Sequence, residues 1–309
     1  MNVRPMFLAA FGLRVDPFLD TADPAFYYEA PSLSHRRRKL HACMAAGRGL
    51  AVVVGPIGAG KTALLNAAQN DMLVGGLRRV GLILDPTFEA EIELLQAAGA
   101  ALAFELPADS SARELKEAFK RELFAAGTNE DGQAALFIDE AQLLDESLFE
   151  TLRSLLNYAL DERKLLSVAL SGQPELSSAI ARHRNFADRV ALWLELEPLS
   201  PAEAAELLHH RLRCAGFMSS DSPFDSEALQ ALWEQSCGLP RRLTALAREA
   251  MEAAAERSSR IVAAADVETA TKLVAPSGAA IGVVKLRRGR NGAARSLPQR
   301  LRAWWKAAT

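Results

Sequence analysis

The sequence is poor in cysteine and has no long hydrophobic run. Its 309 residues include three cysteines, Cys43, Cys214 and Cys237, which lie far apart and form no CxxC pair. This pattern predicts neither a disulfide framework nor a zinc site, and the five histidines also lack a metal-ligand spacing. No apolar run approaches the roughly 18 residues of a membrane-spanning helix, and the apolar opening has no small-residue cleavage site. We therefore expect a protein that is cytoplasmic, or peripheral to the inner membrane, and neither secreted nor membrane-spanning.

Acidic residues are absent from the C-terminal end of the chain, although the net charge is −2. Nine basic residues follow the last acid: Lys272, Lys285, Arg287, Arg288, Arg290, Arg295, Arg300, Arg302 and Lys306. We expect a flexible basic tail over residues 276–309, ending in a short amphipathic helix that carries Trp304 and Trp305. Because arginines neutralise phosphates and indoles stack on bases, double-stranded DNA is one candidate partner for the tail. A membrane surface or another protein is the alternative.

The stretch from Leu50 to Thr62, LAVVVGPIGAGKT, predicts a strand, a glycine-rich loop and a helix. Gly58 and Gly60 can take backbone angles closed to other residues, so consecutive N–H groups can turn inward around an anion at the positive end of the helix. Lys61 supplies a charge for the β- and γ-phosphates, and the Thr62 hydroxyl can ligate Mg²⁺. The stretch therefore predicts a site for ATP and Mg²⁺. Its nucleotide-contacting residues are Gly55, Pro56, Ile57, Gly58, Ala59, Gly60, Lys61, Thr62 and Ala63.

Further apolar segments alternate with helical patterns along the chain. Strands are predicted at Arg79 to Leu84, Ala134 to Ile138, Leu165 to Leu170 and Ala191 to Leu196. Helices are predicted at about residues 35–46, 90–104 and 111–126, and after the third strand, where Leu148, Leu152, Leu155, Leu156 and Leu160 share a face. This alternation, with strands that are apolar throughout, predicts an α/β fold: a P-loop parallel sheet with helices on both faces.

The strand signals stop near residue 199, where a small all-α lid domain is expected. Ser200 to Glu203 is a capping box with proline at the first helical position, and helices are predicted at about residues 201–214, 226–236, 240–257 and 264–273. The expected organisation is an N-terminal arm over 1–34 packed across the body, an α/β domain over 35–198, the lid over 199–275 and the tail. Ser34 is expected to cap the first helix.

Two acids follow the third strand, at the sheet edge where the phosphate loop is also expected. Asp139 would hold Mg²⁺, and Glu140 is placed to orient and polarise the water that attacks the γ-phosphate. Ser171 or Gln173, at the end of the fourth strand, could reach the γ-phosphate or this water. The alternative is that Ser171 and Gln173 only form a turn between the strand and the next helix.

Arginines in two segments could complete the site. Arg241, in the stretch GLPRRL, could reach the γ-phosphate from the second domain, although a surface arginine at a helix start is the competing interpretation. Arg182, Arg184 and Arg189 precede the fifth strand, and any of them could point outward into the site of a neighbouring subunit. The pattern does not choose among the three.

Together, GPIGAGKT, FIDEAQLL, SGQPEL and GLPRRL resemble an AAA+ ATPase, and the segments around Phe11 and Pro17 are similar to its ExeA/GspA branch. The resemblance implies Lys61 and Thr62 as nucleotide and magnesium residues, and Asp139 and Glu140 as the acidic pair. It also implies the roles of first sensor for Ser171 or Gln173, trans-acting finger for Arg189 and second sensor for Arg241. The arm, in this family, helps to enclose the adenine.

The resemblance implies an ATP-hydrolysing switch that forms a homo-oligomer on ATP binding in an ExeA/GspA-like, secretion or envelope-associated system. ExeA-like ATPases continue into a membrane-spanning segment and an outer domain that this sequence lacks. The same architecture occurs in the TnsC/TniB regulators of transposition, so an ATP-dependent DNA-binding regulator is the alternative. A scaffold without hydrolysis is a third hypothesis.

Overall fold

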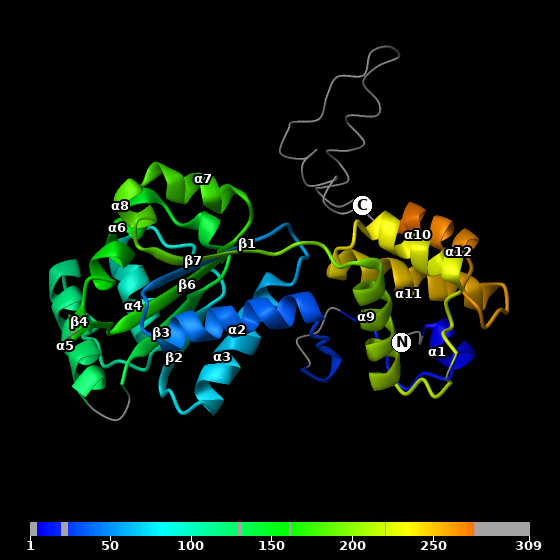
Figure 1. Cartoon of the computed structure of the whole chain (residues 1–309), viewed down its shortest axis with the longest axis horizontal. Coiled ribbons are helices and arrows are strands. Elements are labelled where there is room, and N and C mark those ends of the chain that lie inside the picture. Colours follow the sequence, from blue (N-terminus) through cyan, green and yellow to red (C-terminus); the bar gives the residue numbers. More distant parts are fainter. Residues whose placement is uncertain (1–4, 20–23, 129–131, 161, 220, 275–309) are drawn as a thin grey trace, which may run out of the picture. The chain divides into compact units, whose positions relative to one another are not determined.

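The protein contains a five-stranded parallel sheet in the order β2-β3-β6-β1-β7 (Figure 1). The computed structural model describes residues 5–19, 24–128, 132–160, 162–219 and 221–274. The strands are β1 (Leu50–Val54), β2 (Arg79–Ile83), β3 (Ala134–Ile138), β6 (Leu166–Gly172) and β7 (Val190–Glu195). The five strands predicted from the sequence are therefore confirmed to within two residues at each end.

Helices cover both faces of the sheet, as its apolar strands predict (Figure 1). One face packs on α2 (Pro31–Ala45) and α3 (Lys61–Val74). The other face packs on α4 (Glu91–Ala101), α5 (Ala112–Thr128), α6 (Glu146–Leu155), α7 (Glu175–Arg182) and α8 (Arg184–Ala187). The strands β1, β3 and β6 are buried along their whole length, whereas the edge strand β7 alternates and leaves Trp193 42% exposed. The expectation that both faces of every strand are covered is thus wrong for β7, where Ala191, Trp193 and Glu195 on one face are exposed.

Two local predictions are wrong. The amphipathic helix α6 ends at Leu155, and Leu160 lies in β4 (Ala159–Leu160), which pairs in antiparallel fashion with β5 (Arg163–Lys164). Leucine spacing alone does not show where a helix stops. Helix α2 begins at Pro31 rather than after Ser34, because proline has a φ suited to the first helical turn and no N–H that would need a partner there. Residues 31–34, assigned to the arm, belong to this helix.

Four further helices follow the sheet: α9 (Pro201–Cys214), α10 (Ser226–Ser236), α11 (Pro240–Glu256) and α12 (Ala264–Leu273). The predicted capping box is confirmed, since the Ser200 hydroxyl accepts from the Glu203 N–H at 3.3 Å and the Glu203 carboxylate accepts from the Ser200 N–H at 3.0 Å. Residue 199 lies between β7 and α9, but the division into two domains there stays a prediction.

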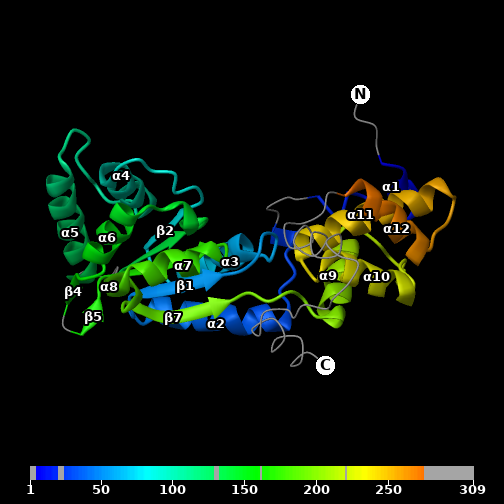
Figure 2. The same cartoon turned by 90° about the horizontal axis from the view of Figure 1, so that it is seen from above.

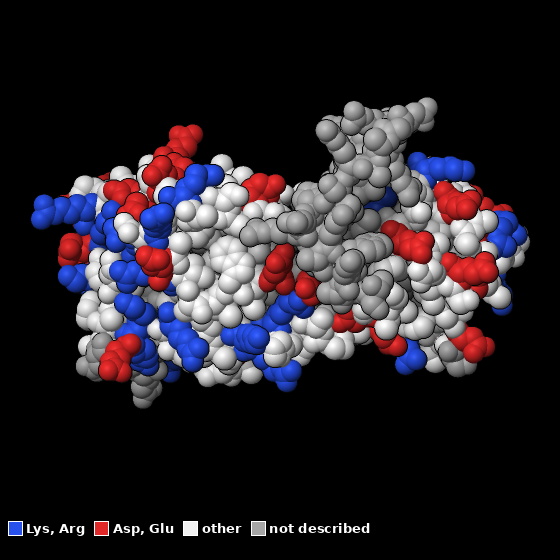
Figure 3. All heavy atoms as spheres, turned by 45° about the horizontal axis from the view of Figure 1, so that its top comes forward, with Lys and Arg blue, Asp and Glu red and all other residues white. Residues whose placement is uncertain are grey.

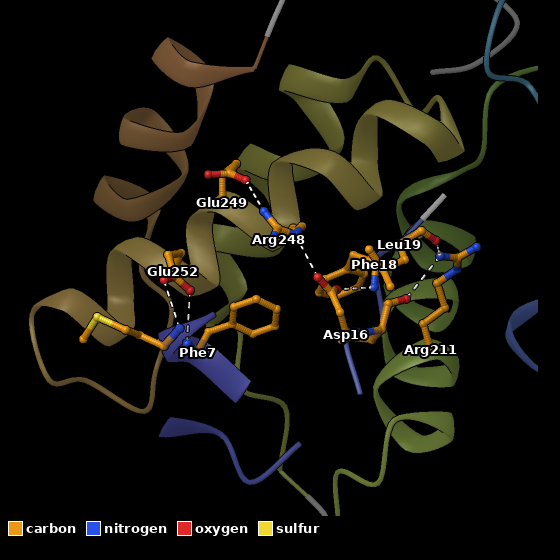
Figure 4. Close-up of polar contacts among 10 residues, drawn as sticks. Phe7, Asp16, Phe18, Leu19, Arg211, Arg248, Glu249 and Glu252 are labelled. Atoms are coloured by element: carbon orange, nitrogen blue, oxygen red, sulfur yellow. Dashed lines mark hydrogen bonds and ion pairs between the residues drawn. The ribbon is translucent and has the colours of Figure 1, made fainter. Parts of the chain in front are cut away.

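The N-terminal segment is ordered where the structure describes it, and it packs on these four helices. Its short helix α1 (Met6–Ala10) lies beside α11 (Figures 1 and 2), and the turn η1 (Pro24–Phe26) lies against α9. The Glu252 carboxylate accepts hydrogen bonds from the N–H groups of Met6 and Phe7 at 3.0 and 3.1 Å (Figure 4). Arg248 binds the carboxylate of Asp16 at 2.8 Å (Figure 4). The arm is therefore held by both apolar and polar contacts.

We expect Phe7→Ala to destabilise the protein by about 3–5 kcal/mol, because the Phe7 ring is fully buried in the core that α1 shares with α9–α12. Urea unfolding followed by circular dichroism measures the change. The exposed neighbour Met6 provides the matched control, and Met6→Ala should leave the unfolding midpoint nearly unchanged. Equal midpoints for Phe7→Ala and the unmodified chain would show that the arm does not contribute to the folded core.

No helix in the part of the chain that the structure describes is both long and apolar enough to cross a bilayer. The predicted basic tail and its amphipathic helix, residues 276–309, lie outside the described residues.

Candidate functional site

The C-terminal ends of three neighbouring strands meet at one edge of the sheet. Val54 at the end of β1 pairs with Gly172 at the end of β6, and Leu170 of β6 pairs with Ile138 at the end of β3. The loops that leave these strands therefore lie side by side, although they are far apart in the sequence. This edge is where open α/β sheets bind ligands.

The loop after β1 has the backbone that its glycines predict. Gly58 has φ +80° and Gly60 has φ +92°, a left-handed region that L side chains rarely adopt. A Cβ on Gly60 would meet open space, so the glycine is required here by the backbone angle and not by crowding. Helix α3 begins at Lys61, directly after this turn, and presents its unpaired N–H groups toward the loop.

Lys61 is 5% exposed and lies against its own loop. Its Nζ donates hydrogen bonds to the carbonyl oxygens of Gly55 and Pro56, at 3.0 and 3.1 Å. Burial lowers the pKa of this ammonium group below the ordinary lysine value, while the nearby carboxylates of Glu140 and Asp139 act in the opposite direction. The loop thus holds a desolvated cation next to two acids.

Asp139, which follows β3, is in direct contact with Thr62 in the first turn of α3. The Thr62 hydroxyl donates to Asp139 Oδ2, and the carboxylate is 2% exposed. The backbone N–H of Asp139 continues the ladder to Ile83 of β2 at 2.8 Å, so the acid is fixed by the sheet itself. The Thr62 hydroxyl and a carboxylate oxygen of Asp139 lie together beside the phosphate loop, and oxygen atoms of these two kinds are suitable ligands for Mg²⁺.

Glu140 adopts φ +48° and ψ +34°, an uncommon conformation for a residue other than glycine. Its carboxylate accepts hydrogen bonds from the side-chain amides of Gln142 and Gln173, the latter at 3.4 Å. The hydroxyl of Ser171 is buried without a hydrogen-bond partner among the described residues. Of the two residues predicted at the end of β6, the structure therefore brings Gln173, and not Ser171, to Glu140.

A cavity of about 560 Å³ extends from the loop along α3. It is lined by Tyr27, Arg37, Ile57, Gly58, Gly60, Lys61, Thr62, Ala63, Asn66, Ala67, Asn70, Glu140, Leu207, Arg211, Pro240, Arg241 and Thr244. From Ala63 onward, the α3 residues in this set are Ala63, Asn66, Ala67 and Asn70, which share one face of the helix. Asn70 lies nine positions after Lys61, which corresponds to roughly 14 Å along the helix axis. A small ligand of this length fits the cavity.

The end of the cavity remote from the loop is polar. Tyr27 contributes a hydroxyl that is buried without a hydrogen-bond partner among the described residues, and burial, with the charge of Glu29, raises its pKa to about 12. Arg37 also lines the cavity and pairs with Glu29 at 2.9 Å and Asp71 at 3.4 Å. Neither Tyr27 nor Arg37, which lies in α2, was predicted as a site residue from the sequence.

The predicted arginines separate into two groups. Arg241 lines the cavity, and its backbone N–H lies 3.4 Å from the Gly58 carbonyl oxygen, so α11 starts at the phosphate loop. Arg182, Arg184 and Arg189 are exposed and do not line the cavity. Arg189 precedes Val190, which pairs with Leu50 at the start of β1. It therefore lies at the edge of the sheet opposite the loop.

Most cavity residues outside the loop were missed by sequence reasoning. The recurrence of Ala63, Asn66, Ala67 and Asn70 on the helix that begins at Lys61 was a usable signal, because a ligand held at the start of a helix lies along one of its faces. No comparable signal exists for Leu207, Arg211 and Thr244, which come from α9 and α11 and reach the cavity only through folding.

The chain is similar to a known protein family and to a curated protein. The sequence profile of a family described as an AAA domain matches residues 44–180. Over 269 residues, the chain is 30% identical to the general secretion pathway protein A of Aeromonas hydrophila, in a match that covers 86% of the chain and 48% of that protein. The chain thus spans about half the length of the curated relative that it matches.

Solved structures with the same fold have low sequence identity. Cdc6p from Pyrobaculum aerophilum is similar with a TM-score of 0.65 at 16% identity, over 82% of this chain and 71% of that one. The ORC2 protein of Aeropyrum pernix, in ADPNP–ADP complexes, is similar with a TM-score of 0.60 at 16% identity, over 87% and 75%.

We assign the protein to the AAA+ ATPases. Three features support this class: the order of the strands in the sheet, the phosphate loop beside the end of the strand that precedes Asp139, and the matched AAA domain. Within this class, the chain is ExeA/GspA-like, since its similarity to the general secretion pathway protein A extends over 86% of the chain.

Proposed function

We propose that this chain binds ATP with Mg²⁺ at the cavity along α3, hydrolyses it, and acts as an oligomerising switch in a secretion or envelope-associated system. The single observation that carries the proposal is the contact between Thr62 and Asp139, which joins the phosphate loop to the acidic end of β3. Lys61 and Glu140 flank this contact and line the same cavity. Two separate segments therefore bring together, at one site, a cation for the phosphates, two oxygen ligands for the metal and a candidate base.

The triphosphate would be held by the loop. The backbone N–H groups around Gly58 and Gly60 and the start of α3 favour an anion, and Lys61 adds a full positive charge. To contact the phosphates, Lys61 would exchange its bonds to the Gly55 and Pro56 carbonyls for charge-assisted bonds. Thr62 and Asp139 would hold Mg²⁺, which when bound neutralises negative charge on the phosphate oxygens.

Hydrolysis requires a water oriented toward the γ-phosphate, and Glu140 is the acid that faces the cavity. Its carboxylate would orient this water and accept its proton. Gln173 is within hydrogen-bond distance of the same carboxylate, so it would report on the γ-phosphate through Glu140. Asp139 is buried behind Thr62 and is better placed to bind the metal than the water.

The adenine would occupy the end of the cavity formed by Tyr27, Arg37 and Asn70. Tyr27 comes from the N-terminal segment and supplies a protonated hydroxyl and an aromatic ring. Asn70 supplies an amide that can both donate and accept. This arrangement supports the expectation that the arm helps to enclose the base.

Two arginines would couple the bound nucleotide to conformational change outside the site and to a neighbouring subunit. Arg241 begins α11 against Gly58, so loss of the γ-phosphate would be transmitted directly to the helices after the sheet. Arg189 is exposed at the end of the sheet opposite its own cavity, so any nucleotide that it contacts would be in the site of another subunit. On the face drawn in Figure 3, Lys and Arg side chains are frequent over the part of the molecule that contains the sheet. Of the three exposed arginines, the resemblance to AAA+ ATPases points to Arg189, which we propose as the trans-acting finger of a homo-oligomer.

The pathway is proposed from the named relative, the general secretion pathway protein A. The alternative, an ATP-dependent DNA-binding regulator similar to TnsC/TniB, depends on a basic tail outside the described residues. Measuring ATP turnover with and without double-stranded DNA separates the two. A rate that rises with DNA and loses this response when residues 285–309 are deleted would favour the regulator.

We expect ATP turnover per subunit to rise with protein concentration, because Arg189 would act on a neighbour. Arg189→Ala should lower the rate at least about tenfold. A non-hydrolysable ATP analogue should still bind. Arg48→Ala provides the control, since Arg48 is also exposed and precedes β1 at the same sheet edge. The trans arrangement would be contradicted if the rate per subunit did not depend on protein concentration while Arg189→Ala was inactive as a monomer. The absence of any turnover by the unmodified chain would contradict the proposed function.

A further inference from the structure

The carboxylate of Glu140 is held by two glutamine amides and by no other hydrogen-bonding group among the described residues. Lys61, the nearest cation of the loop, donates to backbone carbonyls, and the Thr62 hydroxyl donates to Asp139. Neither donates a hydrogen bond to Glu140. Both amides donate to the same oxygen, Oε2, so they define one orientation of the carboxylate.

Gln142 makes the central contact of this arrangement. It lies in the short 3₁₀ turn η2 (Ala141–Leu143) directly after Glu140, and its Nε2 donates to Glu140 Oε2. Its Oε1 accepts from the backbone N–H of Gln173 at 3.0 Å. One side chain thus bridges the end of β3 to the loop after β6, where the second amide originates.

Gly172 leaves the space that this bridge needs. A Cβ at residue 172 would lie 2.6 Å from Gln142 Oε1, and also 2.9 Å from a methyl group of Leu176. Its backbone does not require glycine, since its φ is outside the left-handed region. The strand end is therefore shaped to admit the Gln142 amide.

Gln142 does not line the cavity, whereas Glu140 does. Any effect of Gln142 on the reaction must therefore pass through Glu140 or Gln173. The Glu140 backbone is in a left-handed conformation, which persists only where the surrounding contacts hold it.

We propose that Gln142 is the positioning residue of this active site: its amide orients the Glu140 carboxylate and links it to the loop that carries Gln173. The inference rests on the proposed hydrolysis of ATP and assigns the residue that sets its rate without touching nucleotide or metal. A base displaced by about 1 Å can lose on the order of 100-fold in rate, while ground-state binding is unaffected.

The test compares Gln142→Met with Gln142→Glu in the full chain. The methionine variant keeps the length of the side chain but loses both hydrogen bonds, and its kcat should fall at least about tenfold while KM and the Kd of a non-hydrolysable ATP analogue stay within about twofold. The glutamate variant keeps an acceptor for the Gln173 N–H but places a second carboxylate against Glu140. It should lose at least as much rate. Gln96→Met is the control, since among the described residues the Gln96 side-chain amide bonds only to the Ala108 carbonyl.

A double-mutant cycle identifies the path of the effect. In a Glu140→Gln background, Gln142→Met should lower the residual rate no further, because the group that it positions is already disabled. A second, independent loss of rate would show that Gln142 does not act through Glu140. A glutamate variant with full activity would assign Gln142 to the Gln173 loop alone and overturn the inference.

The outcomes for the two proposals are distinct. No hydrolysis by the unmodified chain, or full hydrolysis by Glu140→Gln, would overturn the proposed function and the inference with it. Turnover that depends on Glu140 but is unchanged in Gln142→Met would overturn the inference alone. Thermal unfolding of each variant, expected within a few degrees of the unmodified chain, shows that a lost rate is not lost structure.

Discussion

Replacing Lys61 with alanine is expected to weaken ATP binding about 100-fold and to abolish measurable hydrolysis. The lysine is the buried cation of the phosphate loop, with its Nζ at 3.0 and 3.1 Å from two loop carbonyls. In a desolvated site, a charged hydrogen bond to phosphate contributes about 1.5–3 kcal/mol, and tenfold in affinity corresponds to about 1.4 kcal/mol. The charge is also needed as negative charge moves toward the leaving phosphate. Titration with a fluorescent ATP analogue measures the affinity.

The control for this prediction is Lys39→Ala, because Lys39 is an exposed lysine on α2 and does not line the cavity. Its affinity for the analogue should be unchanged. Removing Lys61 also leaves the Gly55 carbonyl without its donor, whereas the Pro56 carbonyl still accepts from the Ala59 N–H, so the unfolding temperature of Lys61→Ala must be measured alongside. A folded Lys61→Ala variant with the affinity of the unmodified chain would show that the nucleotide does not lie at this loop.

Glu140→Gln is expected to keep ATP binding and lose about 10²- to 10⁴-fold in turnover. The amide has the shape of the carboxylate, and its oxygen can still accept from the amide of Gln142. It cannot accept the proton of the attacking water. Single-turnover measurements should therefore show ATP bound and intact, and sizing should show the ATP-bound oligomer persisting. This is the opposite pattern to Lys61→Ala, which loses binding first.

Glu162→Gln serves as the matched control, since Glu162 is exposed beside β5 and outside the cavity. Its turnover should equal that of the unmodified chain. Full hydrolysis by Glu140→Gln would remove Glu140 from its proposed role and leave the base unassigned, whereas loss of binding together with turnover would indicate that the acid contributes to the nucleotide or metal site instead.

Several features of the fold could be predicted because their causes are local. The strand at Ala134–Ile138 was placed at its observed bounds, since five apolar residues between polar segments can be buried on both faces. The helix at Ser226–Ser236 was likewise placed as observed, because Asp225 caps its first turn, accepting from the Ala228 N–H at 2.7 Å. Glycines at positions 58 and 60 indicated the left-handed turns that the loop contains.

Other features could not be predicted because they depend on contacts distant in sequence. The end of α6 at Leu155 is followed by the pairing of β4 with β5, which leucine spacing does not reveal. Tyr27 and Arg211 meet at one cavity although more than 180 residues separate them. Ser171 and Gln173 were equivalent candidates in the sequence, and only the direction of each side chain at the end of β6 brings Gln173 to Glu140.

The sequence by itself determined the phosphate loop, the position of the acidic pair after a buried strand and the α/β class, because each follows from the backbone freedom of glycine or from short-range apolar patterning. The tertiary structure alone decided which strands are neighbours, and hence that Thr62 contacts Asp139 and that Gln142 reaches both Glu140 and Gln173. Strand order depends on how helices pack on the two faces of the sheet, and this packing free energy is shared by residues throughout the chain.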